Sequence, residues 1–190
     1  MVYDLICKNR TVRKFRQDKA PSQLMLKSFV ASAARVASAA NLQRLRYFIV
    51  TEKSAEQVFP MIKLGGYLPE GQKPTAAQRP TAYIIVLGPR GRSDANLMID
   101  AGIAAEAITL TAAEASVGSC MIRSFSAESV SALVGREDLE PLLVIALGYA
   151  AETCRITNVD ESGSIRYYIN EEGENVVPKY TADELLVGTV

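Results

Sequence analysis

The segment from Leu97 to Val117 constrains the fold more than any other part of the chain, because it is apolar over most of its length. An apolar run of this length is long enough to cross a membrane. It contains Asp100, Glu106 and Glu114, however, and each carboxylate would cost ~2.5 kcal/mol or more near the centre of a bilayer. We therefore predict no membrane contact and a helix buried on most sides, by its own domain and by a partner chain.

Two residue types are missing, and their absence removes whole classes of enzyme. The 190 residues include no histidine and no tryptophan. Without histidine the chain cannot build a Ser-His-Asp or Cys-His nucleophile, or a zinc or iron site with imidazole ligands. An enzyme made from this chain must use Lys, Asp, Glu, Tyr or Cys chemistry, or borrow a cofactor.

Charge and cysteine content indicate the surroundings in which the chain works. Its 21 basic and 21 acidic side chains give a formal net charge of zero, so we expect no nucleic-acid partner. The three cysteines are odd in number and far apart, which argues against a disulfide framework and for a reducing compartment. The first residues contain no signal-peptide core. We expect a cytoplasmic protein that folds as one domain over residues 1–190.

Apolar periodicity divides the chain into helices and short strands in about equal number. Helices are expected over residues 21–36, 52–64, 97–117 and 127–134. Strands are expected over residues 47–51, 82–87, 119–122 and 142–147, and an extended arm or hairpin over 164–180. Residues 65–80 contain several Gly and Pro and predict a long loop, a kind of segment that is often functional. The pattern predicts an α+β or α/β domain, and no Gly-x-Gly-x-x-Gly supports a Rossmann fold.

A basic cluster precedes the first long helix. The stretch Asn9-Arg10-Thr11-Val12-Arg13-Lys14-Phe15 contains three cations and one hydroxyl. Arginine presents a planar fork of donors that matches phosphate oxygens, and threonine adds a hydroxyl donor. The cluster therefore predicts a site for a phosphate monoester. On charge alone, the alternative is a solvated basic turn balanced by Asp18 and other surface acids.

Five short motifs occur in order along nearly the whole chain. They are Asn-Arg-Thr-Val-Arg-Lys-Phe at 9–15, Ala-Ser-Ala-Ala-Asn-Leu-Gln at 37–43, an Asp100-led helix running into Gly-Ser-Cys at 118–120, Ile-Ala-Leu-Gly-Tyr-Ala at 145–150, and Tyr-Tyr at 167–168 with Val-Pro-Lys-Tyr at 177–180. Together they resemble the motifs of the nitroreductase family of FMN-dependent NAD(P)H oxidoreductases. The resemblance implies a nitroreductase-like α+β fold with a central, mostly antiparallel sheet flanked by helices. It also implies an interlocked homodimer with an extended C-terminal arm and FMN at the subunit interface.

The resemblance implies roles for individual residues as well. Arg10 and Thr11, with Lys179 from the C-terminal arm, would hold the FMN phosphate. Arg13 would lie near flavin N1 and the C2 carbonyl, where a cation stabilises the charge that appears on reduction. The wall that contacts the partner subunit's FMN would consist of Ser38, Ala39, Asn41 and Gln43. The residues facing the flavin edge around N5 would be Met121, Ile122, Arg123 and Ser124.

The function implied by the resemblance is an oxidoreductase with ping-pong turnover. NADH or NADPH would give hydride to the flavin and leave, and a small electrophilic acceptor such as a nitroaromatic or a quinone would then take its place. The flavin would carry the chemistry, so no catalytic side chain is expected, which suits a chain without histidine.

Departures from the family pattern leave other functions open. Asn9 and Tyr180 each stand where the family has an arginine. The loss of two charge-assisted contacts, at roughly 1.5–3 kcal/mol each, would weaken FMN binding. A nearby cation such as Arg16 or Lys14 could compensate. The alternatives are a flavin-binding or flavin-sequestering homologue with little turnover, and a dimeric interaction protein without cofactor.

Several of these residues could instead have purely structural roles. Ser38 and Asn41 could simply end a helix, and Cys120 fits a small buried side chain better than a nucleophile. Arg44-Leu45 stands where the family commonly has Pro-Trp, and Arg123 where it often has Gly, which puts the acceptor pocket in doubt. The loop over residues 63–79 either lines an acceptor channel or crosses the surface.

Overall fold

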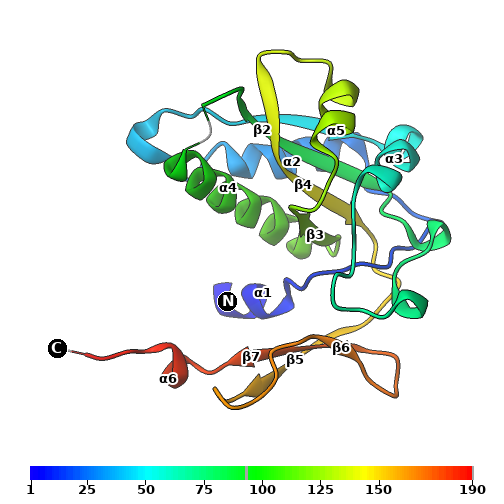
Figure 1. Cartoon of the computed structure of the whole chain (residues 1–190), viewed down its shortest axis with the longest axis vertical. Coiled ribbons are helices and arrows are strands. Elements are labelled where there is room, and N and C mark those ends of the chain that lie inside the picture. The colour runs from blue at the N-terminus through cyan, green and yellow to red at the C-terminus, as the bar shows by residue number, and fades with distance from the viewer. Residues whose placement is uncertain (93, 190) are drawn as a thin grey trace.

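The main sheet has four antiparallel strands in the order β1-β2-β4-β3 (Figure 1). The computed structural model describes residues 1–92 and 94–189. The strands are β1 (Arg46–Val50), β2 (Ala82–Pro89), β3 (Gly118–Ile122) and β4 (Leu139–Gly148). The two central strands, β2 and β4, are buried along almost their whole length. Strands covered on both faces are apolar throughout, and this is why they stand out in the sequence as continuous apolar runs.

Alternate residues of β2 point to two different hydrophobic clusters. Ile84 and Val86 pack in the cluster that contains the buried faces of α2 (Gln23–Ala33) and α4 (Ala95–Glu114). Tyr83 and Ile85 pack in the cluster that contains α3 (Glu52–Val58) and α5 (Ala127–Val134). The predicted arrangement, a mostly antiparallel sheet flanked by helices, is confirmed.

The long apolar helix, α4, begins at Ala95 after Asp94, whose Oδ1 accepts a hydrogen bond of 2.8 Å from the Leu97 N–H. Its face toward α2 and the sheet is buried. On the other side Ile99 and Ile103 remain 59% and 39% exposed. A single chain therefore covers only one face of this helix. None of the helices in the described part of the chain is long and apolar enough to span a bilayer.

Some predicted elements end earlier than expected. The helix that begins at Glu52 stops at Val58 and continues as a 3-10 turn, η2 (Phe59–Met61). The reason is Pro60, which has no N–H for the next helical hydrogen bond. Helix α2 ends at Ala33, three residues before the predicted end. Three helices or strands were not predicted: α1 (Val2–Lys8), which buries no side chain, β5 (Cys154–Val159) and α6 (Ala182–Leu185).

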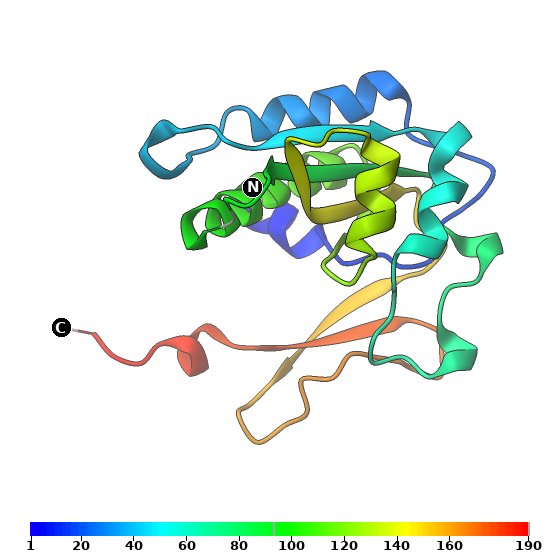
Figure 2. The ribbon, with the colours of Figure 1, turned by 45° about the horizontal axis from the view of Figure 1, so that its top comes forward.

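A second, smaller sheet lies apart from the main one and carries the end of the chain (Figures 1 and 2). Its order is β5-β7-β6, with β6 (Tyr168–Ile169) antiparallel and β5 parallel to β7 (Asn175–Tyr180). Residues 164–180 were predicted as an extended arm or a hairpin, and β6 and β7 form a hairpin there. After α6 (Ala182–Leu185) the red C-terminal segment runs away from the main sheet as an extended arm (Figure 2).

The remaining regular elements are three short 3-10 turns. They are η1 (Ala39–Asn41), η3 (Glu70–Gln72) and η4 (Ala76–Gln78). The last two lie in the predicted Gly- and Pro-containing loop between α3 and β2.

Candidate functional site

The basic segment at residues 11–15 is fixed against the edge strand β3. Thr11 pairs with Ser119 in a parallel bridge, and the Val12 N–H donates to the Ser119 carbonyl oxygen over 2.8 Å. Val12 fits there because residue 118 is glycine: a Cβ at Gly118 would lie 2.8 Å from Val12 Cγ2. On the other side Glu152 Oε1 accepts hydrogen bonds from the Arg13 N–H over 2.5 Å and the Lys14 N–H over 3.1 Å. The backbone of this segment is thus held by the sheet and by one carboxylate.

Arg13 is a buried cation, and one of its N–H groups has no hydrogen-bond partner among the described residues. The residue is only 9% exposed, and its Nη1 is buried without a hydrogen-bond partner among the described residues. Its guanidinium carbon lies 4.0 Å from the centroid of the Tyr167 ring. A buried donor that stays unpaired costs about 1–3 kcal/mol, so an acceptor placed beside Arg13 would be bound favourably.

Arg13 lines a large open cavity of about 1160 Å³. One wall is formed by residues 120–124, so the predicted Met121, Ile122, Arg123 and Ser124 meet Arg13 here. Arg123 Nη1 donates to the Leu142 carbonyl oxygen over 2.6 Å, which ties its side chain to β4. Another wall comes from the long loop, at residues 62–66, 70 and 73–75. Part of this loop therefore lines the cavity and does not merely cross the surface.

Cys120 also lines this cavity, and its environment argues against a nucleophile. Burial raises the pKa of the Cys120 thiol to about 11. The thiol is therefore protonated at neutral pH, and only the thiolate is nucleophilic.

The predicted phosphate-binding residues surround a smaller neighbouring cavity of about 250 Å³. Arg10, Thr11 and Lys179 all line it, although Lys179 comes from the opposite end of the chain. Met121 lines both cavities, so the two adjoin at that side chain. Arg10 Nη2 donates to the Ile6 carbonyl oxygen over 2.6 Å, while its Nε is buried without a partner among the described residues.

The position where the family has its first arginine is used differently in this chain. Asn9 Nδ2 donates to Glu106 Oε1 over 3.2 Å and to Thr109 Oγ1 over 3.0 Å, which ties the basic segment to α4. Arg16 is paired with Asp18 at 2.5 Å on the surface, so it does not replace the lost cation. Lys8 was not predicted as a site residue, yet it lines an adjoining cavity of about 330 Å³ together with Asn9 and Arg10.

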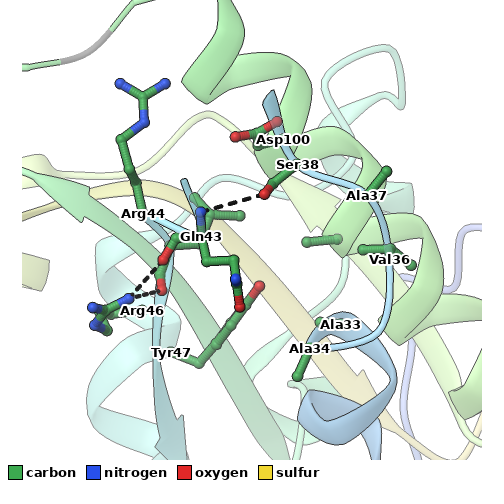
Figure 3. A pocket seen from close by; sticks show the side chains of 12 residues that line it. Ala33, Ala34, Val36, Ala37, Ser38, Gln43, Arg44, Arg46, Tyr47 and Asp100 are labelled. Carbon is green, nitrogen blue, oxygen red and sulfur yellow. Dashed lines mark hydrogen bonds between the residues drawn. The ribbon is translucent and has the colours of Figure 1, made fainter. Parts of the chain in front are cut away.

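The 38–43 loop lies elsewhere, around a third cavity of about 230 Å³ (Figure 3). Ser38 and Gln43 line this cavity, and the Gln43 N–H donates to Ser38 Oγ over 3.3 Å. The Ala39 N–H donates to Oδ1 of the buried Asp100 over 2.8 Å. None of Ser38, Ala39, Asn41 and Gln43 lines either cavity around Arg10 and Arg13. Within one chain, the predicted site residues therefore fall into two separate groups.

An antiparallel main sheet flanked by helices, with a basic segment along its edge strand, defines an α+β fold. Comparison with known proteins identifies the family. The sequence matches the model of the nitroreductase family over residues 6–149. The chain therefore belongs to the nitroreductase family, as its motifs predicted. No curated protein matches it in sequence.

Solved structures share this fold at low sequence identity. A nitroreductase family protein from Clostridium novyi NT is 22% identical, with a TM-score of 0.65 over 79% of this chain and 85% of that chain. The nitroreductase family protein of Streptococcus pneumoniae TIGR4 is 17% identical, with a TM-score of 0.66 over 87% and 96%. An FMN-dependent nitroreductase from Mycobacterium smegmatis, solved in complex with NADPH, is 21% identical, with a TM-score of 0.62 over 79% and 87%. These similarities establish the fold.

Proposed function

We propose that the protein is an FMN-dependent oxidoreductase that passes electrons from NADH or NADPH to a small electrophilic acceptor, such as a nitroaromatic or a quinone, by ping-pong turnover. The observation that carries this proposal is Arg13, a buried cation with an unpaired N–H on the wall of a large cavity. Membership of the nitroreductase family supports the same class of reaction.

The residues present fit a ligand with a phosphate at one end and a planar ring at the other. Arg10, Thr11 and Lys179 would hold the phosphate in the smaller cavity, where the unpaired Arg10 Nε offers a further donor. Arg13 and the 121–124 strand end would contact the ring in the larger cavity. When bound, FMN supplies the hydride-accepting and electron-donating centre of the reaction.

The chain's own contribution is binding and electrostatics. A cation buried as deeply as Arg13 interacts with nearby negative charge through a medium less polarisable than water, so it would favour a bound flavin that carries negative charge over a neutral one. The reaction needs no side-chain acid or base, and Cys120 remains a protonated thiol.

A homodimer is part of the proposal. The 38–43 loop is remote from the chain's own two cavities, and the outer face of α4 leaves Ile99 and Ile103 exposed. Both features suit a second copy that covers α4 and receives the loop beside its own flavin. We also propose a cytoplasmic location, which is supported by the three free cysteines.

Titration of the purified protein with FMN tests the phosphate-binding residues. We expect tight binding by the natural protein and binding weakened roughly tenfold or more in Arg10→Gln, because a charge-assisted contact is lost. Arg35→Gln serves as the matched control, since Arg35 is exposed at the end of α2. A natural protein that does not bind FMN, or an Arg10→Gln variant that binds it equally well, would contradict the proposal.

One observation favours a second candidate, a flavin-binding homologue with little turnover. The side chain that replaces the first family arginine, Asn9, is committed to Glu106 and Thr109 on α4. The phosphate end is therefore supported by fewer cations than in the family pattern. A purified protein that holds FMN but does not reduce it with either NADH or NADPH would favour this candidate.

A further inference from the structure

The Tyr-Tyr motif near the C-terminus has no role in the proposed function so far, yet its first tyrosine lines the larger cavity. Tyr167 lines that cavity together with Arg13. The two residues lie 154 positions apart in the sequence, one before the first long helix and one just before β6.

The Arg13 guanidinium lies over the ring of Tyr167. The guanidinium carbon lies 4.0 Å from the ring centroid, a distance typical of a cation–π contact. Such a contact holds the charge through the ring's π electrons and supplies no oxygen acceptor, so N–H groups of the guanidinium stay available for other partners. This agrees with the buried Nη1 of Arg13, which has no hydrogen-bond acceptor among the described residues.

The hydroxyl of the same tyrosine holds the long loop. The Tyr67 N–H donates to Tyr167 Oη over 3.1 Å, and the two rings lie 5.4 Å apart between centroids with planes tilted by 53°. Arg166 extends the stack, with its guanidinium carbon 5.3 Å from the Tyr67 ring centroid. Contacts therefore run without a break from Arg13 through Tyr167 to the loop that also lines the cavity.

We propose that Tyr167 is a positioning residue, which fixes the Arg13 guanidinium with its N–H edge toward the flavin ring and docks the 63–79 loop as the outer wall of the cavity. This inference rests on the proposed function for Arg13 and extends it to the C-terminal segment. Without the ring, Arg13 becomes more mobile and more hydrated, so it favours the reduced flavin less. Without the hydroxyl, only the loop is released.

Two substitutions separate these two roles. In Tyr167→Leu we expect the ratio of the FMN dissociation constants, reduced to oxidised, to rise roughly three- to tenfold, because the cation–π contact is lost. A tenfold change in this ratio lowers the two-electron midpoint potential by about 30 mV. In Tyr167→Phe we expect the ratio to stay within about twofold, because the ring remains over Arg13.

Hydrogen exchange of the Tyr67 amide in the flavin-free protein provides the second readout. We expect faster exchange in both variants, because each lacks the hydroxyl that accepts the Tyr67 N–H. Tyr168→Leu is the matched control: Tyr168 is the neighbouring residue, is 49% exposed and pairs with Val176 in the small sheet. It should change neither the potential nor the exchange.

The outcomes distinguish this inference from the proposed function. If the natural protein binds FMN and Tyr167→Leu changes neither readout, the inference is overturned and the proposed function stands. If the natural protein binds no FMN, the proposed function fails and the role toward Arg13 fails with it. In that case, unchanged exchange at Tyr67 would overturn the loop-docking role as well, and faster exchange would support it. If Tyr167→Leu does not fold, Tyr167→Phe still tests the hydroxyl, and unchanged exchange in it would overturn the loop-docking role.

Discussion

Two segments that the family resemblance assigns to the flavin, residues 11–15 and residues 38–43, are built in opposite ways. The first is docked on β3 by backbone hydrogen bonds and buries Val12, Arg13 and Phe15. The second is mostly exposed, and Ala40, Asn41 and Gln43 all have positive φ angles, of 48°, 54° and 47°, although none is glycine. The sheet thus makes one side of the proposed site, whereas the side that a second copy would supply is a strained loop held by the Asp100 carboxylate.

The largest difference between the segments should appear when one apolar side chain is removed from each. Phe15 is 1% exposed and Leu42 is 59% exposed. Phe15→Ala should lower the free energy of unfolding by about 3–5 kcal/mol, because it leaves a cavity in the core. Leu42→Ala should change it by less than about 0.5 kcal/mol. Urea unfolding measures both, and similar losses would show that the loop is as well packed as the docked segment.

The single carboxylate that holds the loop provides the next test. Asp100→Ala leaves the Ala39 N–H without its acceptor and should lower the free energy of unfolding by about 1–3 kcal/mol. Asp100→Asn keeps an acceptor oxygen and should cost less. Amide exchange should accelerate at Ala39 in the alanine variant and stay unchanged at Val12, whose N–H is bonded to Ser119. Equal acceleration at both amides would contradict separate support for the two segments.

Backbone strain in the loop predicts opposite effects at two adjacent alanines. Ala40 has a φ of 48°, a region in which an L-residue costs about 1–2 kcal/mol and glycine costs nothing. Ala40→Gly should therefore stabilise the protein by roughly 0.5–1 kcal/mol, after the entropy cost of glycine. Ala39→Gly relieves no strain and should destabilise it by about 0.5–1 kcal/mol. Thermal unfolding of the two variants compares the signs, and the same sign for both would rule out the strain.

The smallest expected effect concerns an ion pair beside the loop. Arg44 forms two hydrogen bonds with Asp94, of 2.6 and 3.0 Å, and this contact lowers the pKa of the Asp94 carboxyl to about 2. A carboxyl with a lowered pKa in the folded state stabilises the protein above its unfolded pKa of ~3.9 and loses that contribution as pH falls toward 2. Asp94→Asn should flatten the pH dependence of the unfolding midpoint in this acidic window. An unchanged profile would mean that the pair adds nothing in solution.

The elements that are deeply buried could be predicted, because burial leaves an apolar pattern in the sequence. Elements that bury few side chains, or that are buried by residues far away in the sequence, could not be predicted. The central strands β2 and β4, the helices α4 and α5 and the 164–180 hairpin were predicted, because continuous or periodic apolar residues mark them. Helix α1 buries no side chain, so it leaves no such pattern.

In the candidate site, too, some features could be predicted from the sequence and others could not. Arg10 and Thr11 were predicted as a phosphate site from the basic cluster, but Lys179 joined them only through the family resemblance, because nothing local in the sequence links residues 10 and 179. The contact of Tyr167 with Arg13 was not foreseen, since it depends on how the small sheet folds back toward β3. The strained loop carried no glycine to mark its positive φ angles.

The central claim is that this chain holds a flavin that a nicotinamide cofactor reduces. Anaerobic addition of NADH or NADPH to the FMN-loaded protein, followed by a quinone, tests it through the visible absorbance of the flavin. We predict that the absorbance bleaches with at least one nicotinamide donor and returns when the quinone is added. A flavin band that persists with both donors would contradict the claim.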